Sequence, residues 1–167
     1  MAYVVTPLMG VALDRTYASL SGSEAGSAAP QLGTMVQAND GSQWLLCQAS
    51  TTIAQYYAVG VDEDFKANPL TGAFASAGYT VGWAQVAVDP TAPYFWAALQ
   101  GRANLNIAVA SSCAADVALY TTTTAGVLDD SATATQALIA GVVIVTTQAS
   151  TTGLAGTEAI ITYARGR

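Results

Sequence analysis

Apolar and polar residues alternate along much of this chain in short runs that have the two-residue period of β-strands. The run Asn104–Val109 shows the period most clearly, because its odd-numbered residues are apolar and two of its even-numbered residues are asparagines. Residues two apart lie on the same face of a strand, so this run predicts a strand with one buried face. A second run, Leu138–Val145, is apolar on both faces and rich in β-branched residues, which predicts a central strand covered on both sides.

Turn-forming residues between apolar runs predict two β-hairpins. Leu32–Ala38 and Ser42–Ala49 flank Asn39-Asp40-Gly41, whose residues tolerate the positive φ of a tight turn. Apolar residues on both faces of the second of these strands predict that the hairpin is covered on both sides. Thr80–Val88 and Tyr94–Gln100 form the second predicted hairpin, joined by a loop that two prolines make rigid.

The remaining apolar runs are shorter and are separated by turn signals. A helical turn is expected to start at Ser50 or Thr51, and Lys66–Tyr79 is expected to be a long loop. Further strands are expected at Tyr57–Asp62, Val117–Thr121, Val127–Leu128 and Glu158–Ala164. About nine or ten short strands without βαβ spacing predict an all-β fold, an antiparallel β-barrel or sandwich, and argue against a parallel sheet. Its expected core includes Trp96, Leu105, Ile107, Val109, Val117 and Leu119.

Residues 1–30 differ in composition from the rest of the chain. Residues 2–13 are apolar but interrupted by Pro7, and Ser19–Pro30 is rich in Ser, Gly and Ala. This pattern predicts an extended N-terminal arm and flexible linker over residues 1–30, followed by a single β-domain over residues 31–167. The arm either docks on a neighbouring subunit or forms an N-terminal strand of its own sheet, and both arrangements fit the pattern.

Charged residues make up only 10% of the 167 residues, against about 25% in an ordinary globular domain. Such a surface is either covered by partner chains or is a neutral, Ala- and Thr-rich surface that stays in water, and we favour the first interpretation. A net charge of −6 without a basic cluster argues against a nucleic-acid partner. The longest apolar run is too short to cross a membrane, so we expect synthesis in the cytoplasm and no membrane partner.

The chain contains no histidine, which removes the commonest general base and the commonest zinc ligand. Cys47 and Cys113 stand in apolar contexts without metal-motif spacing and are expected to be buried thiols, with a disulfide between them left open. Asp62-Glu63-Asp64 and Asp129-Asp130 lack calcium-loop spacing and are interpreted as solvated loop charge, with a Ca²⁺ site as the alternative. We therefore expect no enzyme, no catalytic residues, no cofactor and no metal site.

Several stretches resemble structural proteins of tailed bacteriophages, and in particular the small capsid decoration, or cement, proteins. They are LGTMVQANDGSQWLLCQAS at 32–50, YYAVGVDEDF at 56–65, TVGWAQVAV at 80–88, FWAALQG at 95–101 and VASSCAADVALYTTTTAGVLDD at 109–130. The resemblance implies an all-β virion protein on the outer capsid surface, where copies associated as trimers or dimers bridge neighbouring major capsid subunits and stabilise the shell.

The N-terminal arm and the exposed faces of the two hairpins are the expected contact surfaces. The residues expected to contact the capsid are Tyr3, Val4, Val5, Leu8, Met9, Val11, Leu13 and Arg102. Deletion of residues 1–30 is then expected to weaken capsid attachment and to leave the β-domain folded. One alternative is another virion component, such as a tail, neck or head-fibre subunit. A carbohydrate-binding β-module that stacks sugars on Trp83 or Trp96 is a further alternative, which burial of all three tryptophans would argue against.

Overall fold

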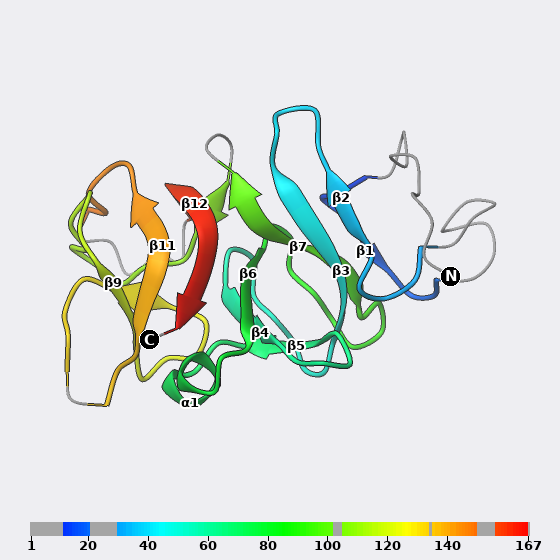
Figure 1. Ribbon diagram of the computed structural model, residues 1–167, viewed down its shortest axis with the longest axis horizontal. Coiled ribbons are helices and arrows are strands. Elements are labelled where there is room, and N and C mark those ends of the chain that lie inside the picture. Colours follow the sequence, from blue (N-terminus) through cyan, green and yellow to red (C-terminus); the bar gives the residue numbers. More distant parts are fainter. Residues whose placement is uncertain (1–11, 21–29, 102–104, 134, 150–155, 167) are drawn as a thin grey trace.

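The computed structural model describes residues 12–20, 30–101, 105–133, 135–149 and 156–166 (Figure 1). In these residues the chain forms twelve β-strands and one short helix, so the predicted all-β fold is confirmed. The elements are β1 Thr16–Tyr17, β2 Met35–Gln37, β3 Gln43–Ala49, β4 Ala58–Val61, β5 Lys66–Pro69, α1 Gly72–Ser76, β6 Thr80–Ala84, β7 Tyr94–Gly101, β8 Asn106–Ile107, β9 Leu119–Thr121, β10 Leu128–Asp129, β11 Leu138–Ile144 and β12 Thr157–Gly166.

Five of these strands close into a β-barrel. Strand β3 pairs with β7, β7 with β6, β6 with β4 and β4 with β5, all antiparallel. Strand β5 then returns to β3 in parallel, with Gln48 opposite Lys66, and this pair closes the barrel. The sequence pattern did not predict this parallel pair, and it was wrong to expect a loop where β5 and α1 form.

The remaining strands extend the sheet on either side of the barrel. Strand β12 joins β7 to β11, β11 lies between β12 and β9, and β10 forms the far edge beside β9. These strands occupy the left of Figure 1, and the barrel occupies the centre. Strand β2 continues the sheet from β3 on the right and is the last strand on that side.

The barrel wall separates two hydrophobic cores. The interior is filled mainly by small or medium side chains, with Leu45 and Cys47 from β3 and Phe95 from β7 among them. The outer face of the wall carries larger side chains, including Trp83 and Trp96, which pack against the strands β8 to β12. The prediction that the first hairpin is covered on both sides is therefore confirmed for strand β3 and wrong for β2, where Met35 and Gln37 are exposed.

The short helix and its neighbourhood correct two predictions. No helix forms at Ser50 or Thr51; that stretch instead leads to Ile53, which makes an isolated antiparallel bridge with Val88. Helix α1 begins after Thr71, whose hydroxyl accepts a hydrogen bond from the Phe74 N–H at 3.3 Å. A threonine at this position satisfies one of the free N–H groups of the first turn. The helix was missed because its five residues are too few to show a period.

Strand β11 is central, as predicted, but it is not covered on both faces. Its register with β12 shifts between Ala140 and Val142, and Gly141 is exposed with φ +87°. A Cβ at Gly141 would lie 2.6 Å from the Thr162 carbonyl oxygen, so the irregularity needs glycine there. The predicted core residue Val117 is 37% exposed and that prediction was wrong, whereas the other five named core residues are buried.

The described part of the N-terminal region belongs to the sheet. Thr16 pairs with Phe95 and Tyr17 with Tyr94, so β1 extends the barrel wall. Leu13, Tyr17 and Leu20 pack against the outer core. Residues 12–20 therefore belong to the sheet of the domain, whereas most of the predicted arm, residues 1–11, lies outside the described residues.

Candidate functional site

The residues expected to contact a capsid fall mostly outside the described part of the chain. Tyr3, Val4, Val5, Leu8, Met9, Val11 and Arg102 all do so. Leu13 is described; it is half-buried and packs against the outer core of its own domain.

All three tryptophans are buried. Trp83 and Trp96 have no exposed surface, and Trp44 is 7% exposed. The indole N–H of Trp44 donates a hydrogen bond to the Ser42 hydroxyl at 2.7 Å. A sugar-stacking platform needs a solvent-exposed ring face. Burial of these rings therefore argues against the carbohydrate-binding alternative, which used Trp83 or Trp96 as the stacking surface.

The acidic run at Asp62-Glu63-Asp64 forms the turn between β4 and β5. One carboxylate oxygen of Asp62 accepts the N–H groups of Asp64 at 3.0 Å and Lys66 at 2.8 Å. The Lys66 ammonium lies 3.7 Å from the Asp64 carboxylate in an exposed ion pair. These contacts hold the turn itself, which supports the interpretation of this run as solvated loop charge.

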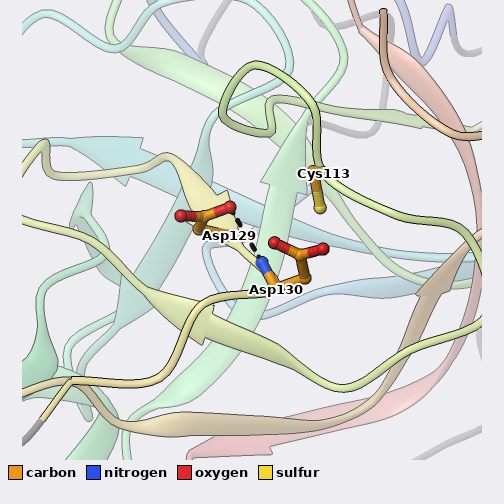
Figure 2. Close-up of side chains that lie close together, drawn as sticks. All are labelled: Cys113, Asp129 and Asp130. Atoms are coloured by element: carbon orange, nitrogen blue, oxygen red, sulfur yellow. Dashed lines mark hydrogen bonds between the residues drawn. The ribbon is translucent and has the colours of Figure 1, made fainter.

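The second acidic pair lies beside a cysteine that is distant in sequence. One ligand atom from each of Cys113, Asp129 and Asp130 can be chosen so that all three lie within 4.8 Å of one another. Figure 2 shows the Cys113 sulfur directed towards the Asp130 carboxylate, with the Asp129 carboxylate beside Asp130. It is the one such group of three in the described part of the chain.

Backbone contacts hold this group in place. The Asp130 carboxylate accepts the Ala114 N–H at 2.9 Å, and the Asp129 carboxylate accepts the Asp130 N–H at 2.9 Å. The Cys113 carbonyl accepts the Gln148 N–H at 2.9 Å. The loop that carries Cys113 is thereby tied both to the end of β10 and to the segment after β11.

Burial is the main cause that disfavours the charged forms of Cys113 and Asp129. Burial, with the Asp130 charge as the next cause, raises the pKa of the Cys113 thiol to about 11. Burial is also the main cause that raises the pKa of Asp129, with Asp130 contributing. A thiol with a raised pKa is a poor nucleophile near neutral pH, because the thiolate is the reactive form. The same protonated thiol must lose its proton before it can bind a metal ion, so the raised pKa argues against covalent catalysis and does not by itself favour a ligand.

Cys47 has a different environment. It lies in the barrel interior with no exposed surface, and burial raises the pKa of its thiol. Both cysteines are free, and they belong to separate cores on the two sides of the barrel wall. Burial of both thiols, which the sequence predicted, is confirmed.

Large apolar side chains are exposed in two places. Near β2, Met35 is 55% and Tyr163 56% exposed, and Phe65 is 36% exposed with its ring against Gly33. Tyr163 is tied to this strand pair because its hydroxyl bonds the side chain of Gln43 in β3. We call Met35, Phe65 and Tyr163 the β2 surface.

The second place is the loop before β9. There the Asp116 N–H bonds the Ile144 carbonyl at 3.1 Å, so the following residues, Val117 and Val145, lie near one another. They are 37% and 42% exposed. We call Val117 and Val145 the loop surface. Met35 lies on the first hairpin, whose exposed face the sequence predicted as a contact surface. Sequence reasoning missed the other members of both surfaces, because only the three-dimensional pairing of distant segments brings them together.

Comparison of the chain with family models, with curated proteins and with solved structures finds no match.

No helix in the described residues has the length and apolar character needed to span a membrane.

Proposed function

We propose that this protein is a virion structural protein that decorates the outside of a phage capsid and stabilises it by bridging major capsid subunits. The observation that carries the proposal is a charge-poor surface with exposed large apolar side chains in two separate places. Only 10% of the residues are charged, and the β2 surface and the loop surface hold the five exposed large hydrophobic residues of the described chain. Exposed apolar side chains that gather in patches favour protein–protein contact.

Bridging requires at least two contact surfaces that one molecule presents in different directions. Strand β2 lies in the right half of Figure 1, and β11, which leads into the loop surface, lies in the left half. The strands that carry Met35 and lead into Val145 are thus separated along the longest axis of the molecule, whereas Tyr163 belongs to β12, next to β11. This separation supports a protein that contacts two neighbours at once, either two capsid subunits or a capsid subunit and a second copy.

Strand β2 also offers backbone groups to a partner. Hydrogen bonds from the Ala38 N–H to Ser42 and from the Leu46 N–H to Thr34 show that the even-numbered residues of this segment face β3. By alternation, the backbone groups of Met35 and Gln37 point away from β3 at the sheet edge. Strand β2 contains no charged residue and no proline, the residues that usually prevent a free edge from pairing with another strand. A strand of a capsid subunit can pair there, which supports attachment to the shell.

The experiment is a binding assay with expanded phage heads that lack this protein. Met35→Ser with Tyr163→Ser tests the β2 surface, Val117→Ser with Val145→Ser tests the loop surface, and Ala87→Ser at an exposed site outside both surfaces is the matched control. Each double variant is expected to reduce the amount that co-sediments with heads by at least about tenfold, because each loses roughly 2 kcal/mol or more of apolar burial. Wild-type binding by both double variants would contradict the proposal.

A further variant in the same binding assay lacks the N-terminal arm. Because β1 belongs to the sheet, the deletion should end at residue 11, before the first described residues. Copy number distinguishes decoration from a tail, neck or head-fibre role. Virions with on the order of hundreds of copies indicate decoration, whereas about six or twelve copies indicate a symmetric ring elsewhere in the particle.

A further inference from the structure

The group formed by Cys113, Asp129 and Asp130 contains one sulfur donor and two carboxylates. The sulfur comes from the loop before β9, and the carboxylates come from the end of β10, sixteen and seventeen residues later in the chain. The fold therefore brings together ligand types that bind divalent metals of borderline softness, such as Zn²⁺. An acidic pair without the sulfur donor would not favour a metal ion of this kind.

The cysteine provides a second observation at this place. Its side chain has no exposed surface, and its sulfur points towards the Asp130 carboxylate (Figure 2). Its one hydrogen bond is a 4.0 Å contact with the carbonyl of the next residue, Ala114, which is too long to satisfy a buried thiol well. A buried thiol directed at the Asp130 carboxylate without a good hydrogen-bond partner is an arrangement that a bound cation would complete.

Among the described residues, no side-chain ion pair balances the charge of this group. In the described residues the one salt bridge joins Lys66 to Asp64, in the turn between β4 and β5. Two neighbouring carboxylates without a cationic partner are unfavourable when partly buried, and a bound cation removes that repulsion.

We propose that Cys113, Asp129 and Asp130 bind a divalent transition-metal ion of the Zn²⁺ type. Binding forms a metal–sulfur bond as the thiol proton passes to solvent, and a carboxylate oxygen from each aspartate completes three protein ligands. Metal–sulfur and metal–oxygen bonds of about 2.3 and 2.0–2.2 Å place donors roughly 3.5–4 Å apart. The present span of up to 4.8 Å needs a contraction of about 1 Å, which side-chain rotation supplies. The fourth position is left for water or a residue of a partner chain.

The proposed ion would act as a structural clamp, independent of the capsid-binding proposal. Asp130 already holds the Ala114 N–H, and Cys113 belongs to the same loop. A metal between them would fix that loop to β10 with bonds stronger than the existing hydrogen bonds. The sulfur ligand argues against Ca²⁺ or Mg²⁺, which take oxygen ligands.

The test uses the full-length protein, freed of metal with a chelator, and Co²⁺ as the spectroscopic probe. A cobalt–thiolate bond gives near-ultraviolet charge-transfer absorption that cobalt bound to oxygen ligands alone does not give. We expect this absorption in the wild type, its removal by added Zn²⁺, and its retention in Cys47→Ser, which changes the other buried thiol. Cys113→Ser should abolish it.

Asp130→Asn gives a second measure that does not depend on the cysteine. Its amide oxygen can still accept the Ala114 N–H, so the loop contact is kept while the charged ligand is lost. We expect at least about a tenfold loss of cobalt affinity, and no change in the exposed-turn control Asp62→Asn. The proposal is overturned if the wild type shows no thiolate–cobalt absorption, or if Cys113→Ser or Asp130→Asn binds cobalt as the wild type does.

Discussion

The turn of the first hairpin supports a buried tryptophan through one serine, and replacing that serine tests how the hairpin is held. The Trp44 N–H donates to the Ser42 hydroxyl at 2.7 Å, and that hydroxyl donates to the Asp40 carboxylate at 2.6 Å. Ser42 is 1% and Trp44 7% exposed. In Ser42→Ala, the indole N–H remains buried without a partner, because the substitution removes its acceptor and adds none.

The expected loss follows from that unpaired donor. A buried donor that loses its partner costs about 1–3 kcal/mol, and the hydroxyl–carboxylate bond is only partly buried, with an exposed carboxylate, and adds less. We therefore expect Ser42→Ala to lower the free energy of unfolding by roughly 2 kcal/mol, or the Tm by about 4–8 °C for a chain of this size. Urea denaturation followed by tryptophan fluorescence measures the change. Ser50→Ala, which removes an exposed serine hydroxyl, is the matched control.

The pH dependence gives an independent check on the same contact. The Ser42 side chain, followed by its backbone N–H, lowers the pKa of Asp40 from its ordinary value of 3.8. A carboxyl with a lowered folded pKa adds stability above its unfolded pKa and loses it as pH falls through the folded value. The difference between wild type and Ser42→Ala should therefore narrow below about pH 4. A loss below about 0.5 kcal/mol at neutral pH would refute the reasoning, since surface substitutions give changes of that size.

Two other features make direct predictions. Gly126→Ala should lower the free energy of unfolding by roughly 2–4 kcal/mol in the same urea assay, because Gly126 has φ +84° and an added Cβ would lie 2.4 Å from the Tyr57 ring; a variant as stable as the wild type would show that the ring moves aside freely. Cys47 and Cys113 should resist a thiol reagent near pH 8 in the metal-free native protein and react together in urea, because both are buried with raised thiol pKa values; rapid labelling of either thiol in the native state would contradict their burial.

Much of the fold could be predicted because its signals are local. The turn Asn39-Asp40-Gly41 lies between β2 and β3 as expected, with Gly41 at φ +82°. The alternating run that begins at Asn104 buries its apolar face as its period indicates. Where periodicity and turn chemistry agree, the physical cause of the structure lies within a few residues.

The missed elements depend on distant partners. Strand β5 contains Lys66, Asn68 and Pro69, which are poor strand formers, and it exists because β3 and β4 supply backbone partners on its two sides. Val117 looked like a core residue because its neighbours are apolar, but the loop that carries it turns the side chain outwards.

The candidate metal site is non-local in the same way. Cys113 and Asp130 are separated by strand β9 and a turn, and no spacing rule joins them. The sequence showed the acidic pair and the cysteine, but it did not show that they lie side by side. Only the folded chain shows that the two features form one site.

The two-sided barrel wall also protects the chain against pairing errors during folding. Along β3 and β7, large residues such as Trp44 and Trp96 alternate with Cys47 and Ala97, and the two sets face different cores. A slip of one residue between strands would turn every side chain to the opposite face. Indole rings would then have to enter the barrel interior, which Phe95 and smaller side chains already fill. The separation of the indole rings from the barrel interior thus disfavours neighbouring registers.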